Sequence, residues 1–326
     1  MHKVALIIIY NHAHNENIEI IERIYKDRFS NIYHLVPFYK GGKTNVIPVY
    51  ESSFHFQGYV NQGFKSFFRE DYTHYLFAAD DLILNPGINE SNYTGHFKLN
   101  SKTCFLPGFI TLHETKVWWP RVAQAFRFDI NYPGAKAKNE LPEYDVALQR
   151  FKKTGLEIKP LRFNQIWRPL GLRPAGSIKD LIRMILDNVL YRLRYWKNKI
   201  TGKKFDLSYP LVGSYSDIFV VSSDAISKFS HYCGIFAATN LFVEIGLPTS
   251  LVLSAEEIVT EDDLKLRGKA LWKDGCIRLN GILERAYGDY KELERYNFNL
   301  KQLLDNFPED SLYLHPVKLS QWNTEL

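Results

Sequence analysis

The sequence predicts an α/β protein with a mostly parallel, Rossmann-like sheet that is flanked by helices and carries a basic helical insertion. Strand-like and helix-like segments alternate over the first 80 residues, which is typical of a doubly wound sheet. The run HYLFAADDLILNP, from His74 to Pro86, is apolar and aromatic until it reaches two adjacent carboxylates, Asp80 and Asp81. Ligands of such sheets bind beyond the carboxyl ends of the strands, so the expected site lies where this run ends.

Strands and helices are expected in turn along the first part of the chain. Short apolar runs predict strands, and apolar residues at helical spacing predict helices. Asn15 is a residue type that favours helix N-termini, and Gly41-Gly42-Lys43 marks a turn. We expect strands at 4–10, 31–39, 46–50 and from 74 to the acidic doublet, and helices at about 16–27 and 55–69.

A second group of elements is expected after residue 213. The apolar run IFVV, which begins at Ile218, predicts a strand, and Ser222-Ser223-Asp224 predicts the start of a helix. We expect the apolar helical region that follows to be interrupted near Gly234. The acidic run over residues 256–263 is expected to be a solvated loop and a helix N-terminus.

The acidic doublet is the strongest functional signal. Two carboxylates at the end of a buried strand repel each other and are costly to desolvate, which favours a bound cation or substrate hydroxyl between them. The alternative is a structural role, because Asp favours turns and helix starts and Asn85-Pro86-Gly87 is a turn signal. If the strand assignments are correct, Asn11 and Glu51 lie at the same edge of the sheet as Asp80.

Two nucleotide-binding classes are disfavoured. The first strand is not followed by Gly-x-Gly-x-x-Gly, and Gly-x-x-x-x-Gly-Lys-Ser/Thr occurs nowhere in the chain. These absences argue against a dinucleotide dehydrogenase and a P-loop NTPase. A phosphate-bearing ligand would therefore need a metal ion at this site.

The strand-helix-strand half that ends in Ala79-Asp80-Asp81 resembles the nucleotide-sugar domain of a GT-A type glycosyltransferase. In that family an acidic motif holds a divalent cation against the diphosphate of the donor. This chain has adjacent acids in place of the commonest Asp-x-Asp form. By position, the resemblance implies that Asp81 binds the metal and that Asp80 contacts the ribose or supports the metal site.

The segment LYLHPVKLSQW, Leu312 to Trp322, is similar to the C-terminal segment of a number of these transferases. The resemblance implies that His315 ligates the metal and that Lys318 contacts the diphosphate. Imidazole and carboxylate ligands suit Mn²⁺ or Mg²⁺, with phosphate oxygens and water completing the site. The alternative is that both residues belong to an ordinary exposed tail.

Two isolated acids are candidates for a catalytic base. Glu244 lies among apolar residues in NLFVEIGLP, where a carboxylate without a partner should have a raised pKa suited to taking a proton from a sugar hydroxyl. It could equally be a surface residue of an amphipathic helix. Asp217 precedes the IFVV strand and could bind a sugar hydroxyl or close a turn. An inverting enzyme would use such a base, whereas a retaining enzyme needs none.

Composition is that of an ordinary globular chain. With 326 residues, 45% hydrophobic and 24% charged, the chain can bury a large core. We expect an α/β nucleotide-sugar region at 1–168, a basic insertion at 169–205 and an acceptor-side region at 206–326, with a soft boundary where Pro and Gly cluster over 168–176. The three cysteines are widely spaced, which argues against a disulfide framework and a zinc site.

The positive charge is concentrated in one segment. Residues 177–204 carry eight Lys and Arg against two Asp, a net charge of +6, whereas the whole chain carries +5. Apolar residues recur there at helical spacing, which predicts a basic amphipathic helix. Such a helix could pack on its own domain, lie on an anionic membrane surface, or form a dimer contact. Nucleic acid is disfavoured as a partner because the remainder of the chain is not basic.

The apolar run after Lys3 is too short for a signal peptide or a membrane span, so we expect a cytoplasmic protein that could dock on the inner face of a membrane. The function expected from the resemblance is transfer of a sugar from a nucleotide diphosphate donor, UDP by family frequency, to a hydroxyl of a glycan or lipid-linked glycan, as in bacterial surface polysaccharide synthesis. One alternative is a sugar-phosphate nucleotidyltransferase, although the glycine-rich loop usual after its first strand is replaced here by Asn11-His12-Ala13-His14. The other is a non-catalytic, membrane-associated assembly factor.

Overall fold

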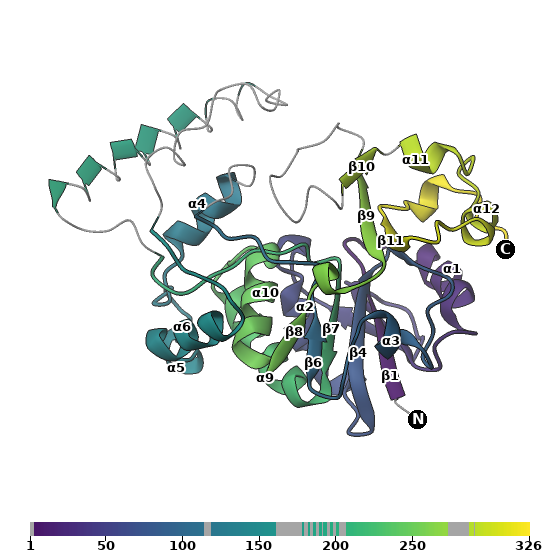
Figure 1. Cartoon of the computed structure of the whole chain (residues 1–326), viewed down its shortest axis with the longest axis horizontal. Coiled ribbons are helices and arrows are strands. Elements are labelled where there is room, and N and C mark those ends of the chain that lie inside the picture. The colour runs from purple at the N-terminus through teal and green to yellow at the C-terminus, as the bar shows by residue number, and fades with distance from the viewer. Residues whose placement is uncertain are drawn as a thin grey trace.

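The computed structural model describes residues 3–113, 119–160, 207–272, 287–289 and 291–326 (Figure 1). Between 178 and 201 it describes individual residues only: 178, 182, 185, 186, 189, 190, 192, 193, 196, 197, 200 and 201. The boundaries expected at 168 and 205 lie outside the described residues. Within the described chain, the expected α/β architecture with a mostly parallel sheet flanked by helices is confirmed.

A seven-stranded mixed sheet forms the centre of the molecule, in the order β3-β2-β1-β4-β7-β6-β8. Its first four strands in sequence run parallel to one another, whereas β7 runs antiparallel to its neighbours β4 and β6. The strands are β1 (Lys3–Ile9), β2 (Ile32–Pro37), β3 (Val46–Val49), β4 (Tyr72–Ala79), β6 (Thr103–Phe105), β7 (Ile218–Ser222) and β8 (Glu257–Val259). The carboxyl ends of β1, β2, β3 and β4 therefore share one edge.

The strands of the first half match the sequence expectations closely. β1 is buried at all but its first residue, as expected for a parallel strand covered on both faces. The helices α1 (Glu16–Tyr25) and α2 (Gln57–Phe67) lie where they were expected, and the short 3₁₀ helix η1 (Ser53–His55) precedes α2. Asn15 was expected to cap α1, but it is already in helical conformation and its side chain makes no capping hydrogen bond.

Alternate residues of β1 enter two separate cores, as the two-residue period of a strand requires. Leu6 and Ile8 pack in a core with α1, β11 (Ser311–His315) and α12, whereas Ala5 and Ile7 pack with α2 and α9. The helices α9 (Ser223–Ala238) and α10 (Val243–Ser254) follow β7, and α12 (Leu300–Asp305) lies near the C-terminus. A third core joins α9 and α10 to the helices α4 (Trp119–Arg127), α5 (Ala137–Glu140) and α6 (Tyr144–Lys153).

Two expectations for the second half were wrong. α9 is not interrupted near Gly234 but continues to Ala238. The glycine is a contact point, because a Cβ at this position would lie 2.6 Å from Asn61 of α2. The acidic run is also not simply a solvated loop, since it contains β8 and the 3₁₀ helix η2 (Glu261–Asp263), and Glu261 is buried.

A smaller sheet, in the order β10-β9-β11-β5, connects the C-terminal segment to the acidic doublet. β5 (Ile83–Leu84) comes directly after the doublet and pairs antiparallel with β11 (Ser311–His315). β9 (Arg267–Trp272) and β10 (Tyr287–Asp289) complete this sheet, and α3 (Tyr93–His96), α11 (Lys291–Glu294) and η4 (Leu319–Gln321) are short. In Figure 1 this sheet stands above the carboxyl ends of β1 and β4. The C-terminal segment is therefore folded against the expected site and is not an exposed tail.

Candidate functional site

Asp80 lies at the carboxyl end of β4, between β1 and α1. Its backbone N–H donates to the carbonyl of Ile9, which extends the β1–β4 pairing by one residue. Asn17 of α1 donates from Nδ2 to Asp80 Oδ2 at 3.1 Å, and the side chain is almost fully buried. Burial and the neighbouring charge of Asp81 raise the pKa of Asp80 to about 7. Hydrogen bonds from Asn17 and from the backbone of Asn11 only partly oppose this.

Asp81 is paired with His315 from the opposite end of the chain. Asp81 Oδ1 lies 3.1 Å from His315 Nε2, and the backbone N–H of Val317 donates to the Asp81 carbonyl at 2.6 Å. The Asp81 side chain keeps 21% of its surface exposed, whereas that of His315 is only 3% exposed. Burial acts to raise the pKa of Asp81, but His315 and the exposed Lys318 outweigh it and the pKa is lowered.

His315 is the centre of an acidic cluster. Burial acts to lower the pKa of its imidazole, but Asp81 and then Asp217 and Asp80 raise it to about 9. The ring also packs edge-on against Tyr215, with the centroids 5.7 Å apart. These carboxylates therefore stabilise the protonated form of the imidazole.

Asp217 and Glu244 belong to the same cluster, although they come from different elements. The carbonyl of Asp217, just before β7, accepts a hydrogen bond from the Ala79 backbone N–H at 2.8 Å. Burial raises the pKa of the Asp217 carboxyl, and Asp81 adds to this rise. Glu244 lies in the first turn of α10, and burial followed by the charge of Asp217 raises its pKa to about 8. The surface-helix alternative for Glu244 does not hold, because its side chain is partly buried at this cluster.

The structure therefore brings most of the predicted site residues together. Glu51 is the exception, because its carboxylate accepts a hydrogen bond from its neighbour Ser52 and no described interaction joins it to the doublet. It follows β3, which lies two strands away from β1 in the sheet. The residues at one place are Asn11, Asp80, Asp81, Asp217, Glu244, His315 and Lys318.

The sequence analysis did not identify three residues of the cluster. Arg121 of α4 stacks its guanidinium 3.7 Å from the ring centroid of Phe242 and lowers the pKa of Glu244 against the effect of burial. Tyr215 packs on His315, and Asn17 binds Asp80. Asn17 did carry a signal, because it interrupts the apolar face of α1 and a buried amide needs a polar partner. Nothing in the sequence around Arg121 or Tyr215 connects them with the doublet.

The Asp81–His315 geometry fits a divalent cation with two protein ligands. Asp81 Oδ1 and His315 Nε2 lie 3.1 Å apart, so a carboxylate oxygen and an imidazole nitrogen, two ligand types that would suit Mn²⁺ or Mg²⁺, face each other. A search of the described residues finds no group of three or more His, Cys, Asp or Glu side chains that could hold a metal. The remaining positions would be filled by substrate phosphates and water, which is the usual situation for Mg²⁺.

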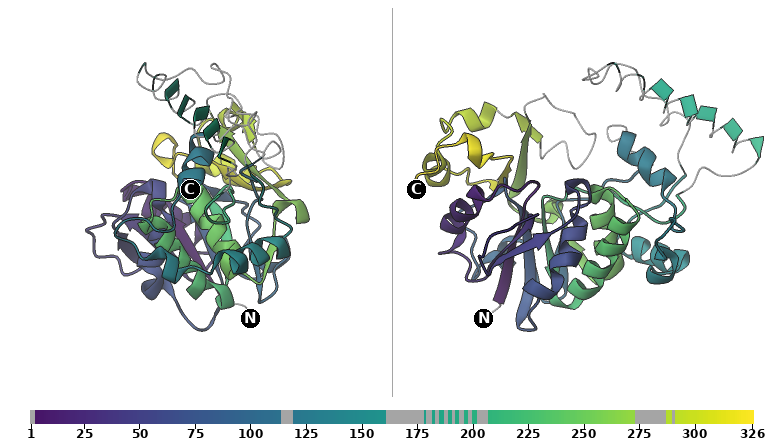
Figure 2. Two further views of the ribbon diagram at one scale, coloured as in Figure 1. Left: turned by 90° about the vertical axis from the view of Figure 1, so that its left-hand side faces the viewer. Right: turned by 180° about the vertical axis from the view of Figure 1, so that it is seen from behind.

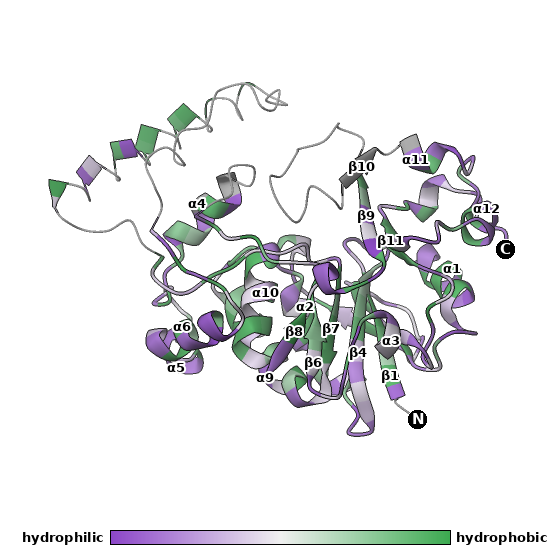
Figure 3. Ribbon diagram, viewed as in Figure 1, coloured by the Kyte–Doolittle hydropathy of each residue, from purple (hydrophilic) through white to green (hydrophobic). Residues whose placement is uncertain are grey.

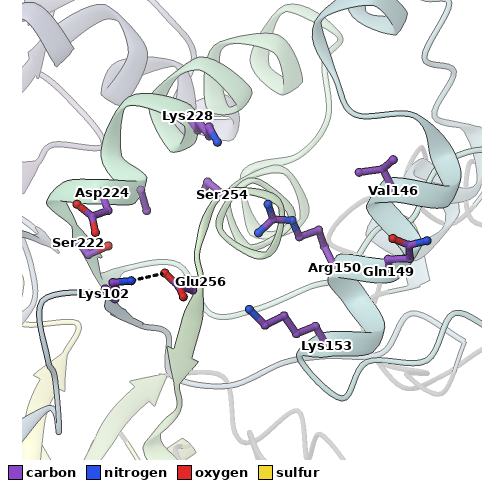
Figure 4. Close-up of a pocket in the computed structure, with 11 residues that line it drawn as sticks. Lys102, Val146, Gln149, Arg150, Lys153, Ser222, Asp224, Lys228, Ser254 and Glu256 are labelled. Carbon is purple, nitrogen blue, oxygen red and sulfur yellow. Dashed lines mark ion pairs between the residues drawn. The ribbon is translucent and has the colours of Figure 1, made fainter.

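A separate cavity of about 650 Å³ lies at the other edge of the sheet (Figure 4). It is bounded by the end of β7 and by side chains of α6, α9 and α10, and none of the predicted site residues lines it. Lys102 and Glu256 form an ion pair in its wall, with 3.3 Å between their charged atoms. This cavity therefore does not belong to the carboxylate cluster.

Comparison with models of known families, with curated proteins and with solved structures gives no match for this chain. Among the described helices, none combines the length and the hydrophobicity needed to cross a membrane.

Proposed function

We propose that this protein is a GT-A-like, metal-dependent glycosyltransferase that moves a sugar from a nucleotide diphosphate donor, a UDP-sugar, to a hydroxyl of a glycan or lipid-linked glycan. The observation that carries the proposal is the pairing of Asp81 with His315 at 3.1 Å. A buried imidazole and a partly exposed carboxylate meet there at the carboxyl edge of a mostly parallel sheet, where nucleotide ligands are commonly bound. The proposal includes a cytoplasmic reaction at the inner face of a membrane.

In this proposal each residue near the doublet has a distinct task. Asp81 and His315 hold Mn²⁺ or Mg²⁺, which supplies charge neutralisation for the departing diphosphate. Lys318 is exposed beside Asp81 and contacts the diphosphate, adding a second positive charge at the leaving group. Asp80 is held in place by Asn17 and accepts a hydrogen bond from a ribose hydroxyl.

The acceptor hydroxyl must lose a proton when it attacks the sugar carbon. Glu244 is the better candidate for an inverting reaction, because a carboxylate whose conjugate acid has a pKa of about 8 is a stronger base than an ordinary glutamate. The proton passes from the hydroxyl oxygen to a Glu244 carboxylate oxygen. Asp217 is the second candidate, since burial also raises its pKa.

A thermal-shift experiment tests the donor site. UDP, GDP, CMP and ADP are each added with Mn²⁺, Mg²⁺ or EDTA to the wild type, to Asp81→Ala and to Asp71→Ala, an exposed aspartate that pairs only with Lys3 among the described residues. A ligand that binds only the folded state raises its stability. We expect stabilisation by UDP that requires metal, survives in Asp71→Ala and is lost in Asp81→Ala. If no nucleotide stabilises the wild type with either metal, the proposed donor site is wrong.

A further inference from the structure

The described residues between 178 and 200 expose a row of large apolar side chains. Their side chains are between 40% and 82% exposed, and each is separated from the next by one, three or four positions, so they lie on one face of a helix. We call this set the apolar stripe. It consists of Ile178, Ile182, Ile185, Leu186, Val189, Leu190, Leu193, Trp196 and Ile200.

This exposure is unusual within the molecule. The described chain has sixteen exposed large hydrophobic residues, and nine of them belong to the apolar stripe. The others occur singly or in pairs, such as Phe38 with Tyr50 and Tyr144 with Val146, whereas a larger contiguous apolar surface marks a place where something binds. None of the nine residues belongs to the three cores of the described chain, so the described part of this face is not buried against the domain.

The net charge of the segment indicates which partner binds the apolar stripe. The segment 177–204 has a net charge of +6, although the whole chain has only +5. Arg192 and Lys197 belong to the described helical residues beside the apolar stripe. An apolar face with basic flanks matches an anionic bilayer interface, where apolar side chains enter the acyl region and cations contact the headgroups. A second copy of the chain would offer the same positive charge and would repel it.

The position of the stripe agrees with this partner. Figures 1 and 2 place the described residues of the segment beyond the carboxyl edge of the sheet, apart from the strands and the helices that cover them. Figure 3 shows most of them in the colours of hydrophobic residues. The stripe and the carboxylate cluster therefore lie toward the same side of the molecule.

We propose that the apolar stripe docks this protein on an anionic membrane surface. The inference deepens the proposed function, which includes a reaction at a membrane, by naming the surface that docks there. It does not depend on sugar transfer, since it is carried by the exposure and charge of a different part of the chain. Docking through the stripe brings to the bilayer the side of the molecule toward which the carboxyl edge of the sheet also lies.

Vesicle sedimentation tests the docking. The full chain is mixed with vesicles of phosphatidylcholine alone or of phosphatidylcholine and phosphatidylglycerol at 70:30, at physiological salt. The test variant is Leu186→Glu/Leu190→Glu/Leu193→Glu in the stripe. The control is Phe38→Glu/Tyr50→Glu/Val146→Glu, which adds the same charge at three exposed apolar residues elsewhere. Circular dichroism and thermal unfolding establish that each variant is folded.

We expect the wild type and the control to sediment with the anionic vesicles and to remain in solution with the neutral ones. The stripe variant should bind at least about tenfold more weakly, and Arg192→Glu/Lys197→Glu should also weaken binding and reduce its salt dependence. The proposal fails if the wild type does not sediment with anionic vesicles, or if the stripe variant binds these vesicles as tightly as the control does. It also fails if light scattering shows a wild-type dimer that the stripe variant abolishes while vesicle binding is unchanged. None of these outcomes depends on nucleotide or metal binding.

Discussion

At the residue scale, two neighbouring carboxylates have opposite properties because their neighbours differ. Asp80 is enclosed and has only amide donors beside it, so burial and Asp81 raise its pKa to about 7. Asp81 faces His315 and Lys318, and these cations lower its pKa despite burial. At neutral pH the ionised Asp81 is thus the carboxylate ready to bind a cation, in agreement with its assignment as the metal ligand in the proposed function.

Asp81→Asn should remove the metal-dependent nucleotide binding while the fold is retained. The amide keeps the shape of the carboxylate but supplies no charge, and we expect metal affinity to fall by at least about 10- to 100-fold. His315 loses its principal partner, so its pKa should fall from about 9. Calorimetry with MnCl₂ measures the affinity, and NMR titration of the imidazole measures the pKa. An unchanged His315 pKa would contradict the pairing itself.

Glu244→Gln should abolish most turnover if Glu244 is the base. Loss of a general base lowers a rate by about 10²–10⁴. The wild-type rate should rise with pH as the carboxyl ionises through its pKa of about 8, and this rise should be absent in the variant. The measurement is kcat/KM between pH 6 and 9, with Glu256→Gln, an exposed acid outside the cluster, as control. A Glu244→Gln enzyme with full activity would assign the base to Asp217 or indicate a retaining reaction.

At the scale of elements, the small sheet brings the two ends of the proposed metal site together. β11 holds His315 beside the doublet because it pairs with β5, which begins two residues after Asp81. The ring of Tyr313 on β11 stacks on Tyr215, with centroids 6.1 Å apart, and Tyr215 packs on His315 in turn. The same ring lies over Gly268 of β9, where a Cβ would be only 2.0 Å from the Tyr313 ring. A residue without a side chain is therefore required there.

Gly268→Val should displace the Tyr313 ring and loosen the position of His315. Overpacking of this kind costs about 1–3 kcal/mol of stability, and metal affinity should fall with it. Gly95→Ala is the matched control, because a Cβ there would meet no atom within 4 Å. Urea unfolding measures the stability of both variants, and calorimetry measures MnCl₂ binding. If Gly268→Val behaved like Gly95→Ala in both assays, the arrangement of these rings would be irrelevant to the site.

At the scale of the whole molecule, the carboxylates of the cluster repel one another, and protonation reduces this repulsion. The pKa values of Asp80 and Glu244 are raised to about 7 and about 8, and that of His315 to about 9. The folded state therefore holds protons at pH values where the unfolded chain has already lost them. Stability decreases with increasing pH wherever the folded state binds more protons.

The metal-free protein should accordingly become less stable between pH 6 and 9. The contribution of His315 is fully present below pH 6.5 and is lost as the pH rises through about 9. The destabilisation by Asp80 and Glu244 accumulates from their ordinary pKa values of 3.8 and 4.5, where the unfolded carboxyls ionise, up to about 7 and about 8. Mg²⁺ replaces the lost positive charge, so it should raise the unfolding temperature more at pH 8.5 than at pH 6. Differential scanning calorimetry with MgCl₂ or EDTA checks this. An equal Mg²⁺ effect at both pH values would argue against cation binding at the cluster.

The sequence by itself determined the strands β1 to β4 and β7, the helices α1 and α2, and the edge of the sheet at which Asp80 and Asp81 stand. These follow from apolar periodicity and from the rule that parallel strands end together, both of which are local or nearly local properties. The placement of His315 and Lys318 beside the doublet was predicted only by resemblance, and Asn15 and Gly234 were misread because their roles depend on what packs against them.

Only the tertiary structure decided which acids share one electrostatic environment. Arg121, Tyr215 and Asn17 act on the site through contacts between elements that are distant in the chain, and no sequence pattern specifies such contacts. The pKa of Glu244 likewise depends on its burial and on the proximity of Asp217, which lies in the segment before β7. This segment is joined to α10 by a hydrogen bond of 2.9 Å from the Ser214 backbone N–H to the Glu244 carbonyl. Burial and charge proximity are properties of three-dimensional packing, whereas periodicity is a property of the chain. This is why the sequence indicated the edge of the site and individual candidate residues, but not which of them share one environment.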